Sequence, residues 1–178
     1  MISNPESLQE TVQRAANEYV GLLNSTSDRW PFFYGLEEGR TMRWGGSKVF
    51  STIHYPPALR VLYEKLCDLL PSLAHQCPDC LPTWYEPGRI SLNYHQDKSC
   101  EKLFGRRELV LLLFAGAPRN LAIKRHRQGR IIEILRCTAL QTIVLTPAAN
   151  KIFFHAKLPE DVNTSSLTFA FRRGKPAQ

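Results

Sequence analysis

The sequence predicts an α+β protein with helices in its first half and a β-sandwich or barrel in its second. Two helix-type apolar patterns lie before residue 81, and short apolar runs with period-two alternation follow from residue 89. Little helical sequence separates these runs, which favours a sandwich or barrel over an alternating βαβ sheet. We expect one domain over residues 1–178, with a helical region at 1–80 and a β core at 81–178.

The first half contains two expected helices. The first is predicted from Asn4–Pro5, a capping side chain followed by a proline at the first position, to about Leu23. The second follows Pro56–Pro57, where apolar residues again recur at three- and four-residue steps, and Pro71 stops it. Residues 29–55 between them are aromatic, basic and rich in glycine, which predicts strands and turns near the surface.

Seven strands are predicted in the second half from apolar alternation and from the turn residues that flank each run. They are Arg89–His95, Glu108–Ala115, Leu121–Arg125, Ile131–Arg136, Gln141–Leu145, Lys151–His155 and Ser166–Arg172. Residues 124–130 form a hairpin-like basic turn between the third and the fourth of these strands. Such a turn can bind phosphate groups, although a solvated loop explains the same charges.

The charge and the hydropathy of the chain restrict its location and its partners. A formal net charge of +7 suits nucleic acid or an anionic small substrate, and it also simply keeps a protein soluble. The longest apolar run is too short to span a bilayer, and the N-terminal residues lack the pattern of a secretory signal. We expect a cytoplasmic monomer that does not associate with membranes.

Cysteine usage fits a reducing compartment. Five cysteines without a secretory context predict free thiols. Cys77 and Cys80 form a lone CxxC motif. With His75 it offers too few ligands for zinc, so a plain loop is the expected structure there.

Three side chains near predicted strand ends suggest a metal site. His95 and Asp97 are two residues apart, so an extended backbone points both to one face. His155 ends a strand much later in the chain, where a rolled sheet can bring it to the same cavity. Two histidines and one carboxylate leave half of a metal's positions open, as in the facial triad of non-haem Fe(II) oxygenases. Tetrahedral zinc with a bound water is possible with the same ligands.

Arg172 adds a cation at the end of the last predicted strand. A guanidinium on a strand beside the metal can bind the far carboxylate of a metal-bound dicarboxylate. The ordered set of His-x-Asp, a distant histidine and this arginine is a more specific sign of such a site than any of its parts.

With these residues, the chain resembles the AlkB-type Fe(II)/2-oxoglutarate dioxygenases from about Arg40 to the C-terminus. Residues 85–88 are similar to the family's Tyr-x-Pro-Gly turn, residues 95–98 to its HxDK strand end and residues 166–169 to its closing strand. Further likenesses are the apolar strand Leu111–Gly116, the second histidine His155 and the lid segment Arg43-Trp44-Gly45. The resemblance implies a double-stranded β-helix, or jelly roll, with N-terminal helices packed on one sheet.

The resemblance also implies the cofactors. Fe(II) would be bound by His95, Asp97 and His155, and 2-oxoglutarate by the metal, with Arg172 and Tyr85 on its far carboxylate. O2 would then oxidise a nearby C–H bond of the substrate. Hydroxylation of an N-methyl group releases formaldehyde, so such a site acts as a demethylase.

Alkylated DNA or RNA is the substrate that the resemblance implies. Trp44, with Met42 and Arg43, is the candidate lid that stacks on an extruded base. Lys124 and Arg125 in the basic turn are the candidate phosphate contacts. A hydroxylase of a small molecule in a biosynthetic pathway is the alternative function, and a non-catalytic or zinc-holding β-barrel is a third.

The closing strand departs from the family pattern. The family's two arginines fall on Thr164 and Ala170, and its asparagine two residues before the tyrosine falls on Thr83. Arg172 lies two residues beyond Ala170, on the same face of the strand. One arginine, or Arg172 together with Arg173, must therefore do the work of two.

Overall fold

The structure, a computed structural model, describes residues 6–25, 32–44, 48–88, 91–97, 109–160 and 163–175. Arg43, Trp44 and Lys48 are described by their backbone alone. The helices are α1 (Leu8–Ser25), α2 (Pro57–Leu69), α3 (Pro71–Ala74) and α5 (Pro147–Ile152). The strands are β1 (Phe33–Gly35), β2 (Thr41–Trp44), β3 (Lys48–His54), β4 (Asp79–Tyr85), β5 (Leu92–His95), β6 (Val110–Gly116), β7 (Arg119–Lys124), β8 (Ile131–Cys137), β9 (Thr142–Leu145), β10 (Phe154–Lys157) and β11 (Ser166–Arg172).

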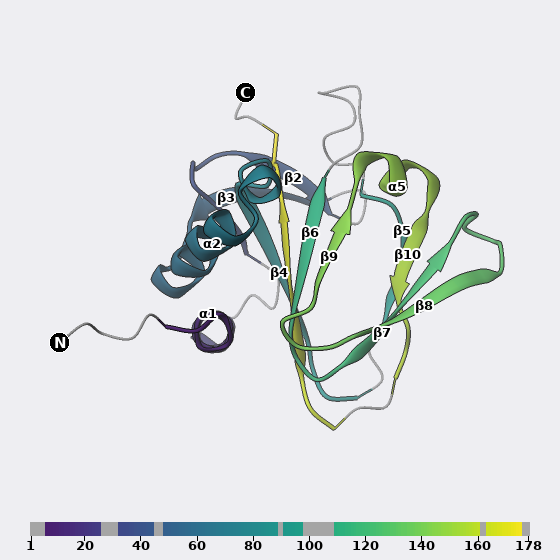
Figure 1. The fold of residues 1–178 in the computed structure, drawn as a ribbon. Helices are drawn as coiled ribbons and strands as arrows, with labels where there is room; N and C mark the ends of the chain where they lie inside the picture. Colours follow the sequence, from purple (N-terminus) through teal and green to yellow (C-terminus); the bar gives the residue numbers. More distant parts are fainter. Residues whose placement is uncertain are drawn as a thin grey trace.

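Two sheets face each other beside a helical layer, and they diverge toward α5 (Figure 1). The larger sheet has seven strands in the order β2-β3-β1-β4-β11-β6-β9, and the smaller has four in the order β5-β10-β7-β8. Among the described strands only β1 and β3 pair in parallel. The chain therefore combines helices with large, mainly antiparallel sheets, as the sequence predicted.

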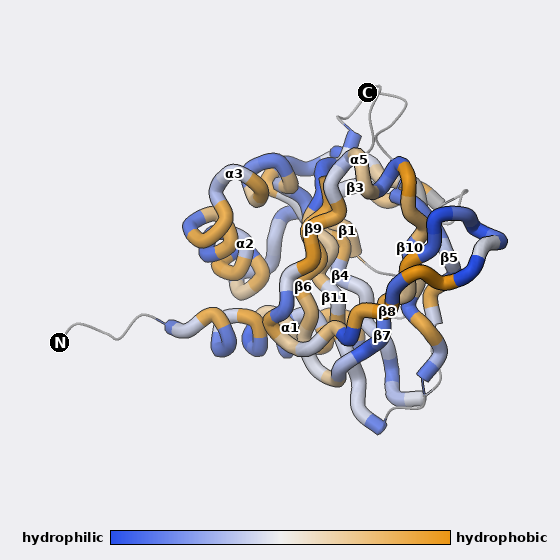
Figure 2. The backbone as a smooth tube through the Cα atoms, turned by 45° about the vertical axis from the view of Figure 1, so that its right-hand side comes forward, coloured by the Kyte–Doolittle hydropathy of each residue, from blue (hydrophilic) through white to orange (hydrophobic). Residues whose placement is uncertain are grey.

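The helical layer covers one face of the seven-stranded sheet. One buried cluster joins α1 and α2 to β4, β6 and β11, and apolar segments run through this interior (Figure 2). Tyr19, Leu59 and Phe169 are members that are at most 1% exposed. The expected packing of N-terminal helices on one sheet is confirmed. None of the described helices is long and apolar enough to cross a membrane.

The first helix begins later than its expected start at Asn4–Pro5, since α1 starts at Leu8. Ser7 Oγ accepts the N–H of Glu10 at 3.2 Å, and the Glu10 carboxylate accepts the N–H of Ser7 at 2.7 Å. This reciprocal capping box satisfies two N–H groups at the helix start, which explains the later boundary.

Two predicted boundaries near prolines are wrong. Lys151 belongs to α5 and not to a strand, because Thr146 caps this helix and Pro147 occupies its first turn. β4 occupies part of the segment expected as a loop around Cys77 and Cys80. β4 tolerates Pro82 because β1 pairs with it only at Cys80 and Asp79.

The described cysteines agree with the thiol prediction. Cys67, Cys77, Cys80 and Cys137 are in no disulfide, and the last three are buried.

Candidate metal centre

A cavity between the two sheets contains the predicted metal ligands. It lies on the face of the seven-stranded sheet opposite the helices, and the four-stranded sheet forms its other wall. Its lining residues are Leu81, Thr83, Tyr85, Leu92, His95, Asp97, Leu112, Phe114, Leu121, His155, Lys157, Thr168, Ala170 and Arg172.

The structure brings His95, Asp97 and His155 together. One ligand atom from each lies within 4.8 Å of the other two. The two imidazole rings are 4.2 Å apart between centroids, and His155 Nε2 is 3.5 Å from Asp97 Oδ2. His95 and His155 are direct partners in the ladder between β5 and β10, which explains why residues so distant in sequence meet.

A β-bulge in β5 sets the direction of His95. His155 pairs with His95 and Lys157 pairs with Leu92, so β5 has one residue more than β10 between these pairs. Leu92 and His95 both line the cavity as a result, although three positions separate them. His95 Nδ1 donates to the C=O of Asn93 at 2.8 Å, which leaves the Nε2 lone pair for a metal.

The charge states of the other two ligands also suit a cation. Burial, opposed in part by Asp97, lowers the pKa of His155 to about 4, so its imidazole is neutral at pH 7. Burial by itself would raise the pKa of Asp97, but Arg172 and the two histidines outweigh it and lower that pKa to about 2. Two histidine nitrogens and an ionised carboxylate form a donor set that fits Fe(II), and zinc as well.

Arg172 lies directly against this set. Its guanidinium forms an ion pair with Asp97 Oδ1, while Oδ2 faces His155. Arg172 is 4% exposed, and its NH1 lies 3.1 Å from Met42 Sδ. Ala170 lines the cavity as well, so these two residues share one face of β11 as expected from the sequence.

Lys157 is a second buried basic side chain in the cavity, and it was not predicted from the sequence. Its Nζ donates to Thr168 Oγ1 at 2.6 Å and lies 3.7 Å from the centroid of the Tyr85 ring. Burial, the largest influence, lowers the pKa of Lys157 to about 7. The signal for this residue was its place two positions after His155, on the same face of a strand.

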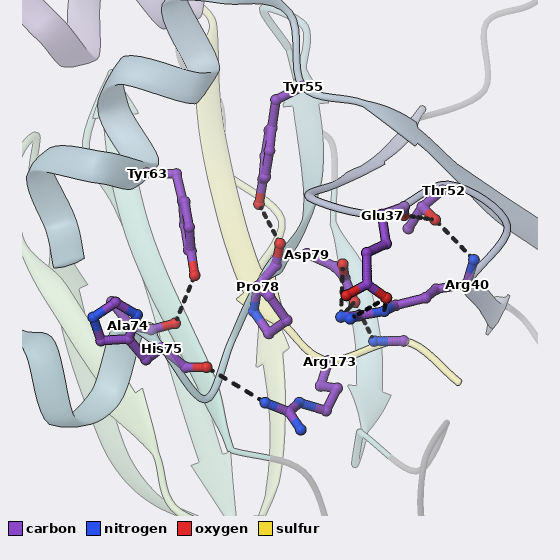
Figure 3. A network of polar contacts seen from close by, with 11 residues as sticks. Glu37, Arg40, Thr52, Tyr55, Tyr63, Ala74, His75, Pro78, Asp79 and Arg173 are labelled. Carbon is purple, nitrogen blue, oxygen red and sulfur yellow. Dashed lines mark hydrogen bonds and ion pairs between the residues drawn. The ribbon is translucent and has the colours of Figure 1, made fainter. Parts of the chain in front are cut away.

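The residues that correspond to the rest of the AlkB-type cosubstrate pattern do not all line the cavity. Tyr85 and Thr83 line the cavity, whereas Thr164 is exposed in the loop before β11. Arg173 is exposed and donates to the C=O of His75 at 3.4 Å, so it does not line the cavity with Arg172 (Figure 3). The second cation of the cavity is therefore Lys157 and not Arg173.

The candidate lid residues lie on β2, which pairs with β3. Met42 is fully buried with Phe33 and Leu81, and its Sδ contacts Arg172, but Met42 is not among the residues that line the cavity. The side chains of Arg43 and Trp44 lie outside the described residues, and so does Gly45.

A buried carboxylate holds the start of this hairpin (Figure 3). Asp79 accepts the N–H of Gly174 at 2.6 Å and forms an ion pair with Arg40 at 3.5 Å. Arg40 also pairs with Glu37 at 2.7 Å. The backbone of Thr41, the first residue of β2, exchanges two hydrogen bonds of 2.8 Å with Lys175. The segment after β11 and the loop before β2 are thus joined at one point.

The basic turn lies at the same end of the four-stranded sheet as the metal ligands. Lys124 is the ladder partner of Phe154, the residue before His155. Lys124 Nζ lies 4.0 Å from the centroid of the Tyr94 ring, and Arg125 is exposed. The turn is the hydrophilic segment that joins β7 to the more apolar β8 in Figure 2.

Comparisons with known proteins give little beyond this geometry. No protein-family pattern and no curated protein matches the chain. A solved prolyl-4-hydroxylase from Pseudomonas putida is similar, with 15% identity and a TM-score of 0.42 over 93% of this chain and 80% of that chain.

Proposed function

We propose that the chain is an Fe(II)/2-oxoglutarate-dependent dioxygenase with His95, Asp97 and His155 as its metal ligands. The convergence of these three side chains at one wall of a cavity carries the proposal. Zinc enzymes use similar ligands, but the two additional buried cations in this cavity favour a site that also binds an anionic cosubstrate.

The strand order supports a jelly roll, the double-stranded β-helix expected from the resemblance. The eight strands β4 to β11 are divided into the orders β4-β11-β6-β9 and β5-β10-β7-β8, so first pairs with last and second with seventh. Two interlocked Greek keys have such an order. It puts β5 beside β10, which is what the metal site requires.

Lys157 and Arg172 are the proposed cosubstrate cations. The resemblance implied that Arg172 binds the far carboxylate of 2-oxoglutarate, but Arg172 lies against Asp97 and is therefore on the metal side of the cavity. Lys157, with Thr168 and Tyr85 around it, offers a charge and two hydroxyl groups to the far carboxylate. When bound, the iron and 2-oxoglutarate supply the oxidation of a substrate C–H bond by O2.

The protein's own residues bind and orient these groups. The three ligands would hold the metal, and Arg172 keeps the Asp97 carboxylate ionised. The apolar walls from Leu81, Leu112 and Phe114 exclude water from the cavity.

Alkylated nucleic acid is the proposed substrate, with demethylation as the reaction. The net charge of +7 and the basic turn beside the metal ligands support a polyanion. Trp44 and Arg43 on β2 stay the proposed lid residues. Hydroxylation of a small molecule in a biosynthetic pathway is the alternative, and the net charge of the chain suits an anionic one equally.

The deciding experiment measures succinate release by iron-loaded protein across methylated oligonucleotides and small-molecule pools. His95→Ala and Asp97→Ala are expected to abolish iron binding and 2-oxoglutarate decarboxylation. Turnover retained in either variant would reject the metal assignment. Zinc that stays bound through iron exchange, without any turnover, would instead identify a zinc-holding β-barrel.

A further inference from the structure

We infer that Asn150, on α5, is a positioning residue that fixes the backbone of Asp97, an inference that rests on the proposed metal site. Asn150 Oδ1 accepts the N–H of Asp97 at 2.9 Å, and Asn150 Nδ2 donates to the C=O of Asp97 at 2.9 Å. Asn150 is 1% exposed, so both bonds are sheltered from water. The amide side chain holds this peptide segment as a neighbouring strand would.

Asp97 needs such a partner because it lies beyond the end of its strand. The ladder between β5 and β10 ends at the pair of His95 with His155, so sheet pairing does not hold the Asp97 backbone. The carboxylate must nevertheless lie beside both histidines, since ligand positions within about 0.5 Å decide whether a metal site works. Gln96 Nε2 donates to the C=O of Lys151 at 3.0 Å and links the same segment to α5 a second time.

The start of α5 determines where the Asn150 amide lies. Thr146 accepts the N–H of Ala149 at 3.2 Å with its side chain and the N–H of Asn150 at 2.8 Å with its C=O. β10 begins at Phe154, directly after the helix and its C-cap. One short segment therefore carries His155 and also holds Asp97, which couples the positions of two ligands.

Asparagine is the side chain that suits this position. It offers one acceptor and two donors in the plane of a peptide-like group, so it can bind an N–H and a C=O together. An aspartate of the same shape keeps the acceptor and loses the donor at neutral pH. Alanine removes both and leaves two buried backbone groups without this partner.

The test titrates the metal-free full-length protein with Co(II), whose absorption bands report coordination geometry, and measures its Kd by calorimetry. Asn150→Ala is expected to raise this Kd about 10- to 100-fold, the usual effect of removing a group that orients a metal ligand. Asn150→Asp should raise it as well and alter the bands. Lys151→Ala, an exposed neighbour on the same helix, should change neither.

A second control separates positioning from stability. Leu62→Ala truncates a buried side chain of α2, and it should lower the unfolding temperature without changing Co(II) affinity or the bands. Wild-type Kd and bands in both Asn150 variants would overturn the inference and leave the proposed function standing. An equal loss of affinity in Leu62→Ala would overturn it too, because stability would then explain the effect. Wild-type protein that binds no Co(II) would reject the metal site and the inference together.

Discussion

At the scale of single residues, the candidate centre depends on a few charged side chains buried beside one another. His95, Asp97 and Arg172 could be predicted because each lies at or just beyond the end of a strand whose alternation the sequence reveals, and His155 because it follows a short apolar run. Lys157 follows the same alternation, but the expected strand stopped at His155, whereas β10 continues to Lys157. Its burial depends on residues from other strands, which no local pattern contains.

The charge of Lys157 is expected to act on the cosubstrate. Lys157→Met keeps the length of the side chain and removes the charge, so the KM for 2-oxoglutarate should rise about 10- to 100-fold, in line with the roughly 1.5–3 kcal/mol of a charged hydrogen bond. Steady-state decarboxylation at varied 2-oxoglutarate measures this. Lys151→Met, on the exposed side of α5, is the matched control. An unchanged KM in Lys157→Met would leave Arg172 as the sole cation for the cosubstrate.

The buried imidazole of His155 should make the metal-free protein sensitive to acid. Its pKa is about 4 in the folded chain against 6.5 in the unfolded chain, so between these values the unfolded state binds the additional proton. Stability should therefore fall as the pH drops from 6.5 toward 4, by up to about 3 kcal/mol. Urea unfolding across this pH range measures it. His155→Gln should flatten the dependence and His54→Gln, at an exposed histidine, should not; the same slope in all three proteins would contradict the assignment.

At the scale of elements, small irregularities place the functional side chains. The bulge in β5 turns His95 toward the cavity, and α5 puts Asn150 beside Asp97. Neither was predicted. A bulge depends on how two strands pair, and the apolar run from residue 151 looked like the start of a strand although Thr146 and Pro147 signal a helix.

The contacts of Asp79 with Gly174 and Arg40 are expected to hold the β2–β3 hairpin in place. Asp79→Ala leaves the N–H of Gly174 and the guanidinium of Arg40 without this carboxylate, so the free energy of unfolding should fall by about 2–4 kcal/mol. Chemical denaturation gives this value. Glu38→Ala removes an exposed carboxylate from the loop before β2, and its free energy of unfolding should stay within about 0.5 kcal/mol of wild type. Equal effects of the two substitutions would show that the contacts of Asp79 contribute no stability.

At the scale of the whole molecule, helices α1 and α2 lie on one face of the seven-stranded sheet and the candidate site lies on the other. The sequence alone predicted the division into helical and β-rich halves, because helical and strand periodicities differ. It left the strand order undetermined, since pairings such as β4 with β11 join residues far apart in the chain. The opposite placement leaves the basic turn near the metal ligands and away from α1 and α2.

The basic turn should account for much of any binding to single-stranded nucleic acid. Replacing Arg125 and Arg127 with Gln should weaken binding and reduce the slope of log K against log salt by about 0.7 for each lost phosphate contact. Fluorescence anisotropy at several salt concentrations provides both quantities. Arg14→Gln with Arg60→Gln, two half-exposed arginines on the helical layer, makes the same change in net charge and should keep the slope. Identical slopes in the two double variants would favour the small-molecule alternative.

The continuity of α5 with β10 has a consequence for protein engineering. A designer who grafts this centre onto another sandwich must transfer the helix with the strand, because the strand alone would bring His155 without the amide that holds Asp97. A one-residue insertion between Asn150 and Phe154 would change the position of Asn150, which holds Asp97, relative to the strand that carries His155. Loop engineering near the site should therefore leave the number of residues between Asn150 and Phe154 unchanged.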